Sequence, residues 1–149
     1  MALLETIRSA IRTKGETDIA ALRGATLGRR KPLGGLPRLW VHIPTFTMDG
    51  QPGAVTERYT LTYPGFLEVA VPNSESRADT EAADLLYAVI VSWRSGIQLG
   101  LGSSGVVGSF LSSATPAYET NDAGVSFLVG YDLVWTVPML ETLQTPRSV

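Results

Sequence analysis

The sequence contains no cysteine, a single histidine and few charged residues. Without cysteine the chain has no disulfide, no thiolate nucleophile and no cysteine-ligated metal site. His42 alone provides too few ligands for the common metal sites, and any Ser-His-Asp arrangement would depend on it entirely. Charged residues make up 17% of the chain and hydrophobic residues 44%, which indicates a folded protein. We therefore expect no metal and no cofactor.

Long hydrophobic runs are also missing. The longest, residues 85–93, covers about half of a membrane span. Glu5 and Arg8 interrupt the apolar pattern of residues 1–11, so we expect no signal peptide and no membrane contact. A chain of 149 residues is most simply one domain, and a domain of this size buries ~70% of the surface that its unfolded chain exposes.

The net charge of -2 conceals an asymmetry between the two halves of the chain. Residues 1–74 hold nine Lys and Arg against six Asp and Glu, whereas residues 75–149 hold three against eight. The halves therefore carry +3 and -5, which sum to -2. Either the charges are spread over solvated faces, or one face of the protein packs against the opposite face of a second copy.

Residues 125–137 give the clearest secondary-structure signal. Every second side chain is apolar, which predicts a long strand with these residues on one side of a sheet: Val125, Phe127, Val129, Tyr131, Leu133, Trp135 and Val137. The opposite row includes Leu128 and Val134 and carries less charge than a solvated surface normally does. This row is therefore predicted to make a second contact, and Leu128 and Val134 are candidate interface residues.

The remaining elements follow from periodicity and from Gly and Pro. Helices are expected at about residues 3–15 and 76–95, and loops at 24–37 and 45–56. Strands are expected at residues 38–44, 57–72 and 106–113, with a bulge or bend at Pro64 and Gly65. The order α-β-β-α-β-β predicts a single α+β domain over residues 1–138, in which a mixed or antiparallel sheet of about four strands packs against two helices. Residues 139–149 are expected to form a flexible tail.

The second helix is apolar beyond its buried stripe. That stripe is predicted to contain Ala82, Leu85, Leu86, Val89, Ile90, Trp93 and Ile97. Tyr87 and Val91 lie off the stripe, and Val91 points almost directly away from it. Either a second layer of the same fold or a neighbouring subunit would cover them, so both are candidate interface residues.

Few residues favour catalysis. The carboxylates in or beside strands are Glu68, Glu119, Asp122 and Asp132, and two of them could form a glycosidase-like pair. Exposed or neighbour-paired carboxylates are more common, and a half-buried structural role is expected for His42. Residues 100–105 match G-x-G-x-x-G, but a helix precedes them and a strand follows, which is the reverse of the dinucleotide-binding order. A flexible loop is the better interpretation.

Arg29, Arg30 and Lys31 form a basic cluster flanked by Gly and Pro. This cluster could contact phosphate or an acidic patch on a partner, or it could be a solvated loop. No aromatic residues are interleaved with it, so sequence-specific recognition of nucleic acid is not expected.

The order and spacing of these elements resemble the tail-terminator (tail-completion) family of long-tailed bacteriophages, the group that is like lambda minor tail protein U. The resemblance covers roughly residues 2–138. It lies in LLETIRSAI, PLGGLPRLWVHIP, LEVAVP, ADTEAADLLYAVIVSW and the closing hairpin SSATPAYETNDAGVSFLVGYDLVWTV. These segments match in pattern and contain no invariant signature.

The resemblance implies an α+β subunit of the virion, assembled in the host cytoplasm, that forms a hexameric ring at the head-proximal end of the tail tube. The ring would stop tube growth and provide the surface to which the filled head binds. Its partners would be further copies of itself, the tail tube protein and a connector or stopper protein, with DNA passing nearby through the ring. Such a protein acts by binding and is not an enzyme.

Three alternatives remain open from the sequence. The protein could be another neck ring, such as a stopper. It could be a small hydrolase or transferase that uses His42 with a carboxylate such as Glu68 or Asp132. It could also be a small-ligand binding module, although no distinctive polar constellation supports that interpretation.

Overall fold

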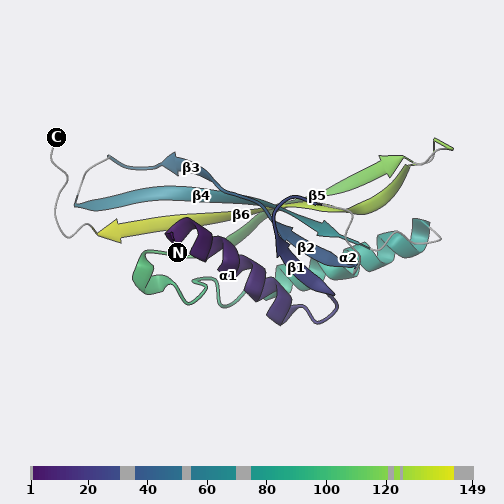
Figure 1. The fold of residues 1–149 in the computed structure, drawn as a ribbon, viewed down its shortest axis with the longest axis horizontal. Helices are drawn as coiled ribbons and strands as arrows, with labels where there is room; N and C mark the ends of the chain where they lie inside the picture. The colour runs from purple at the N-terminus through teal and green to yellow at the C-terminus, as the bar shows by residue number, and fades with distance from the viewer. Residues whose placement is uncertain are drawn as a thin grey trace.

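The computed structural model describes residues 2–30, 36–51, 55–69, 75–120, 123–124 and 126–142, without the side chains of residues 75–79, 126 and 127. Within these ranges, two α-helices lie on one side of a six-stranded mixed sheet (Figure 1). The helices are α1 (Leu3–Asp18) and α2 (Glu75–Ser92), with a 3-10 turn, η1 (Gly102–Ser104). The strands are β1 (Gly24–Leu27), β2 (Arg38–Val41), β3 (Thr45–Met48), β4 (Thr56–Glu68), β5 (Phe110–Thr120) and β6 (Ser126–Thr142). The predicted α+β class is confirmed, with six strands where about four were expected.

Two long strands form the centre of the sheet. The strand order is β1-β2-β4-β6-β5, and β3 pairs with β4 beside β2. β4 and β6 pair without interruption from Thr56 opposite Thr142 to Glu68 opposite Gly130. β1 and β2 are parallel, and all other pairs are antiparallel. The long pair runs along most of the molecule, so the sheet extends beyond the helices at one end (Figure 1).

The two strands that sequence patterns missed, β1 and β3, lie in segments predicted as loops. β2 and β3 continue along the same edge of β4, but a break separates them opposite Pro64. The His42 backbone N–H donates to the Pro64 carbonyl at 2.8 Å, and Pro64 has no N–H with which to donate in return. Pro44 also lacks an N–H, so the ladder stops after β2 and resumes at Thr45.

Of the bulge or bend expected at Pro64 and Gly65, the bulge is wrong, because β4 keeps its register with β6 through both residues. Gly65 is required for a different reason. A Cβ atom at this position would overlap the ring of Trp135 and the carbonyl oxygen of Trp40. The irregularities lie instead in the β5–β6 pair, where Ser112 is an extra residue on β5 and Val129 is an extra residue on β6.

The bulge at Val129 also corrects the predicted faces of β6. Leu133, Trp135 and Val137 lie on the helix-covered side and are fully buried, as the alternation predicts. Because the bulge reverses the alternation, Leu128 turns into this same core, and Val129 packs on the opposite side of the sheet.

β6 also continues past the predicted start of a flexible tail. Met139 is buried and pairs with Tyr59, and Thr142 pairs with Thr56. Residues 139–142 therefore belong to the sheet. Residues 143–149 lie outside the described part of the chain.

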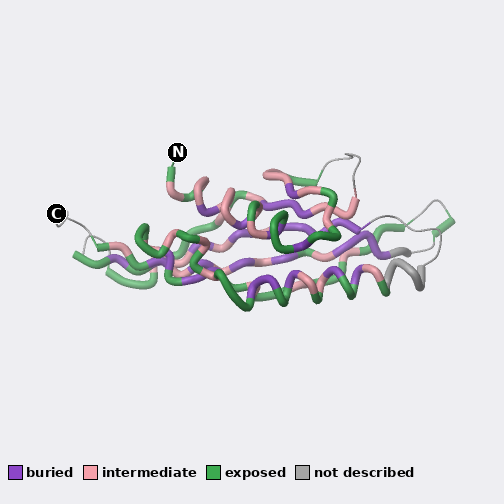
Figure 2. The backbone as a smooth tube through the Cα atoms, turned by 90° about the horizontal axis from the view of Figure 1, so that it is seen from below, coloured by how far each residue is buried: buried purple, intermediate pink, exposed green. Residues whose placement is uncertain are grey.

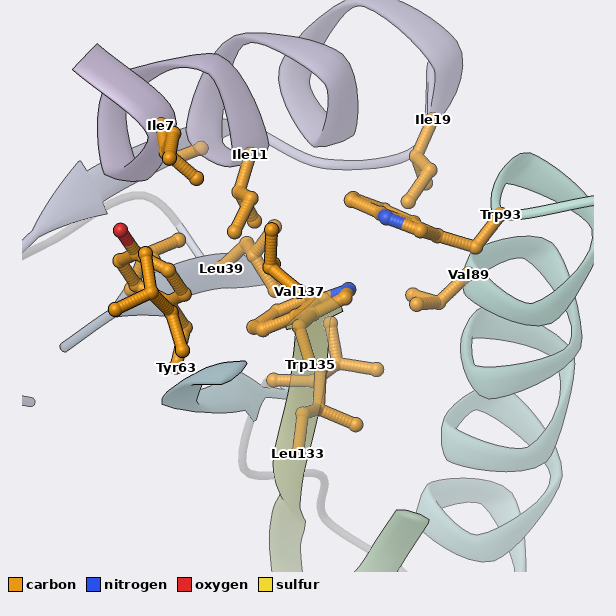
Figure 3. Close-up of a cluster of buried hydrophobic side chains, with 14 of the residues drawn as sticks. Ile7, Ile11, Ile19, Leu39, Tyr63, Val89, Trp93, Leu133, Trp135 and Val137 are labelled. Carbon is orange, nitrogen blue, oxygen red and sulfur yellow. The ribbon is translucent and has the colours of Figure 1, made fainter. Parts of the chain in front are cut away.

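The main core lies between the sheet and the two helices. Ile7 and Ile11 of α1 and Trp93, which directly follows α2, lie in one apolar cluster with Trp135 of β6 (Figure 3). The rings of Trp93 and Trp135 lie 5.2 Å apart with an interplanar angle of 47°, a tilted arrangement that aromatic pairs favour. In Figure 2 the buried stretches of the two helices face the strands, and the exposed stretches face solvent.

The stripe predicted for the second helix is buried only in part, because Leu86 and Ile97 are half-buried and α2 ends at Ser92, before Trp93 and Ile97. Ala82, Leu85, Val89 and Trp93 are buried, but Ile90 is 38% exposed. Ile90 lies one position beyond Val89 and therefore falls at the solvent edge of the stripe.

Candidate functional site

His42 follows β2 and is half-buried. Its Nε2 atom has no hydrogen-bond partner among the described residues. Burial, Arg29 and Arg8 all lower the pKa of His42, and Asp132 opposes them. A lowered pKa makes His42 a weaker base than a free histidine.

The structure brings two of the candidate carboxylates together, but around a cation. Arg30 Nε donates to Glu68 at 2.5 Å, and Arg30 Nη1 donates to Glu119. Trp40 Nε1 donates to the other oxygen of Glu68 at 3.2 Å. The hydrogen bonds to Glu119 and Glu68 raise the pKa of Arg30. This arrangement is an ion-pair network and not a general acid–base pair.

Asp132 does not join this network. Asp132 is exposed on β6, where it pairs with Phe66 on β4 and Thr115 on β5. Asp122 lies outside the described residues. In the part of the chain that the structure describes, no three His, Cys, Asp or Glu side chains are placed to hold a metal ion.

The basic cluster is divided by the fold. Arg30 lies over the ring of Phe66 at 5.6 Å and holds Glu68 and Glu119, so its charge is used within the subunit. Arg29 is exposed, and no ion pair with a described residue engages it. Lys31 lies outside the described residues. Of the two described members of the cluster, Arg29 is therefore the one that no described carboxylate engages.

The glycine-rich segment at residues 100–105 is a loop between α2 and β5 that contains η1. A cavity of about 380 Å³ lies between this loop and the end of β6. Glu141 lines that cavity and accepts a hydrogen bond from the Tyr59 hydroxyl at 2.9 Å. A carboxylate in this place disfavours phosphate, so the structure supports the loop interpretation over nucleotide binding.

Helix α2 presents an apolar surface to solvent. We call Asp84, Tyr87, Ala88 and Val91 the α2 outer face, because their spacing of i, i+3, i+4 and i+7 places them on one side of the helix. Tyr87 is 58% exposed and Val91 is 42% exposed, so both lie outside the core as predicted. Arg94 lies over the Tyr87 ring at 5.8 Å. Their role in an interface remains a prediction.

A groove adjoins the α2 outer face. It has a volume of about 290 Å³ and is lined by Ala21, Pro37, Glu81, Asp84, Leu85 and Ala88. Sequence patterns cannot reveal the groove, because Ala21 and Pro37 are distant from α2 along the chain and only the fold brings them together. Helical spacing places Asp84 on the same side of α2 as Val91, two turns apart, and that spacing is the one signal in the sequence.

The side of the sheet opposite the helices is the open face. Val134 lies on it, half-buried, between Pro64 of β4 and Ser113 of β5. Leu128, the other predicted interface residue of β6, is in the main core and cannot serve that role. Much of the open face carries uncharged hydroxyl side chains, which include Thr45, Thr47, Thr60, Thr62 and Thr136.

The free edges of the sheet differ. β5 pairs on one side only, and Pro116 and two register shifts interrupt it. β3 also pairs on one side only, but it contains no charge and no proline. The Asp49 N–H donates to the Arg58 carbonyl at 3.0 Å, so the backbone of Asp49 faces β4. In an antiparallel ladder the residues that face the partner strand alternate with those that face away. The N–H and C=O groups of Phe46 and Met48 therefore point away from β4, toward the free edge. No described residue pairs with the outer edge of β3, which is therefore open to pairing within the described ranges, whereas β5 is protected.

No protein-family model matches this sequence, and no curated protein matches it at a significant level. No helix in the described ranges is long and apolar enough to cross a membrane.

Proposed function

We propose that this protein is a structural subunit that forms a ring, of the tail-terminator type, in the virion of a long-tailed bacteriophage. The ring, a hexamer, caps the head-proximal end of the tail tube, stops its elongation and presents a surface to the neck. The protein acts by binding and has no catalytic turnover. The observation that carries this proposal is the α2 outer face, an apolar surface on a helix that its own fold leaves uncovered.

Two further features support an assembly role. The α+β class of the described elements agrees with the fold class that the family resemblance implies. The open edge of β3 offers outward backbone groups to an extended segment of a partner. In this mechanism one surface joins neighbouring subunits, while another binds the last layer of the tube.

The chemistry of the described residues gives less support to an enzyme. Glu68 and Glu119 are bridged by Arg30, and His42 is a weakened base. The cavities described above are lined by other residues than His42. A stopper or other neck ring is the nearest alternative, and it is distinguished by its partner: a terminator binds the tube protein, whereas a stopper binds the connector.

The native mass of the purified protein, measured over a range of concentrations with particle images from the same sample, tests the proposal. A discrete hexameric ring is the expected result. A strict monomer at all concentrations, also in the presence of assembled tail tubes, would contradict it.

The Val91→Glu variant tests the surface itself. We expect it to weaken ring formation at least tenfold, because a charge replaces an apolar side chain in the contact. The free energy of unfolding of the monomer should change by less than about 0.5 kcal/mol, since Val91 is outside the core. Ring formation is measured by native mass and stability by urea unfolding.

Ile90→Glu is the matched control. Ile90 is on the same helix and is exposed to a similar degree, 38%, but it lies on the other flank of α2. It should leave ring formation unchanged. Equal loss of assembly in both variants would mean that the α2 outer face is not the contact surface.

A further inference from the structure

The groove beside the α2 outer face combines an apolar floor with an acidic rim. Leu85, Ala88 and Pro37 form the apolar part, and Glu81 and Asp84 provide carboxylates. Its volume of about 290 Å³ is at the lower limit of small-molecule sites, roughly 300 Å³. A long side chain with an aliphatic stem and a cationic end, which means Arg or Lys, fits this chemistry.

Asp84 is the carboxylate that makes the groove attractive to a cation. It is exposed, and no ion pair with another described residue neutralises it. Val91 is seven residues further along α2, on the same side of the helix, so the groove and the α2 outer face form one continuous surface. A partner that covers Val91 therefore also reaches Asp84.

Arg29 is the cation that matches this rim. It is exposed, and its neighbour Arg30 is occupied by Glu68 and Glu119. Arg30 covers Phe66, which lies on the open face, so the segment that contains Arg29 leads onto the side of the sheet opposite the helices.

Arg29 cannot reach the groove of its own subunit. The groove lies at the start of β1, where the Arg23 N–H donates to the Pro37 carbonyl at 2.9 Å, whereas Arg29 follows the end of β1. The four residues of β1 separate the two sites by roughly 13 Å of extended chain. Only the Arg29 of another molecule can occupy the groove.

Other exposed arginines fit less well. Arg94 already stacks on Tyr87. Arg58 lies at the far end of β4, paired with Leu140 of β6. Arg23 adjoins the groove of its own copy through its bond to Pro37.

We propose that Arg29 of one copy inserts into the groove of the next copy and pairs with Asp84. The contact joins the open face of one subunit to the helix-covered face of its neighbour. It is therefore heterologous, and a heterologous contact closes into a ring when the rotation per subunit fits. It also uses the opposed charges of the two halves of the chain, +3 and -5. The inference rests on the proposed ring and specifies its subunit contact.

Charge reversal tests the pair. Arg29→Glu and Asp84→Arg should each weaken association about tenfold per contact, because like charges then face each other. The double variant Arg29→Glu/Asp84→Arg restores the pair in reversed order between neighbours, so its association should return to within about threefold of the parent. Arg58→Glu is the control with the same change of charge at a distant site, and it should assemble normally. Circular dichroism and thermal unfolding verify that each variant is folded.

If the single variants form rings as well as the parent, or if the double variant does not recover, the Arg29–Asp84 contact is wrong, although the ring itself would stand.

A second measurement does not require a stable ring. Because the chain has no cysteine, single Arg29→Cys and Asp84→Cys chains can be mixed and treated with a short bismaleimide.

The expected product is a covalent dimer from the mixture, with much less from either variant alone or from Arg58→Cys mixed with Asp84→Cys. Absence of the selective cross-link overturns the inference. A protein that gives the cross-link but no ring in native mass measurements would overturn the proposed hexamer and leave this contact supported.

Discussion

The two faces of the sheet are stabilised in different ways. On the helix-covered face, side chains from both helices and from the sheet form one large apolar cluster around Trp135. On the open face, the described residues form a small buried cluster of Trp40, Phe66 and Val129, and Arg30 lies over it between two carboxylates. The first face depends on close packing, which salt and pH affect little, whereas the second depends on charges, which they affect strongly.

The difference explains which side is free for partners. Helices already occupy the first face, so contacts there must use the outer surface of a helix, as at Tyr87 and Val91. On the open face, the described structure places Arg30 and its two carboxylates over Phe66. Elsewhere this face carries many uncharged threonine side chains. A subunit built in this way has two chemically distinct sides, which suits a heterologous contact.

The largest effect is expected from the packed face. Trp135→Ala should lower the free energy of unfolding by about 3–5 kcal/mol, because it leaves a cavity beside Trp93 and Gly65. Urea unfolding followed by far-UV circular dichroism measures the loss. Val134→Ala, the adjacent half-buried residue on the open face, is the control and should cost about 1 kcal/mol. Similar losses in the two variants would contradict the contrast between the faces.

An intermediate effect is expected from the ion-pair network of the open face. Glu68→Ala should cost about 2 kcal/mol, because it leaves the buried Trp40 Nε1 without its acceptor and removes a partner of the partly exposed Arg30. Glu119→Ala should cost less than about 0.5 kcal/mol, since Glu119 is 48% exposed. Chemical unfolding of both variants at low and high salt measures the difference. A cost for Glu119→Ala equal to that for Glu68→Ala would show that exposure does not separate the two carboxylates.

The smallest effect is expected from His42. Its pKa in the folded protein is lowered, mainly by burial, so the unfolded chain binds the proton first as the pH falls below about 6.5. Stability attributable to His42 is therefore complete above that pH and is lost as the pH falls toward the folded pKa. His42→Gln should remove this dependence between about pH 7.5 and about pH 5.5, as measured by urea unfolding at each pH. An unchanged slope in His42→Gln would refute the assignment.

Sequence patterns predicted the packed face better than the open face. Leu133, Trp135 and Val137 follow simple alternation, and Ala82, Leu85 and Val89 follow helical spacing, so their burial could be predicted. These patterns are strong because one continuous apolar surface requires them.

The errors occurred where local chemistry does not determine the backbone. A bulge at Val129 reverses the faces of β6, and nothing in the residues nearby distinguishes it from a regular strand. β3 is a strand because β4 pairs with it, although its sequence between Pro44 and Gly50 favours a loop. Arg29 and Arg30 are adjacent in one basic motif, which suggests a shared role. Their roles differ because Arg30 pairs with Glu68 and Glu119, and the motif does not reveal these tertiary contacts.

The pairing of β4 with β6 also determines when the sheet can form during synthesis. Thr56 lies opposite Thr142, and α2, η1 and β5 lie between these two strands in the chain. Pairings so distant in sequence require costly loop closure and slow the folding of β-rich domains. On the ribosome, β3 and β4 would therefore emerge before β6. Until β6 follows, the edge of β4 that pairs with β6 is exposed together with the outer edge of β3. In a protein whose β3 edge stays open after folding, this interval is the time at which premature association with other chains is most favoured.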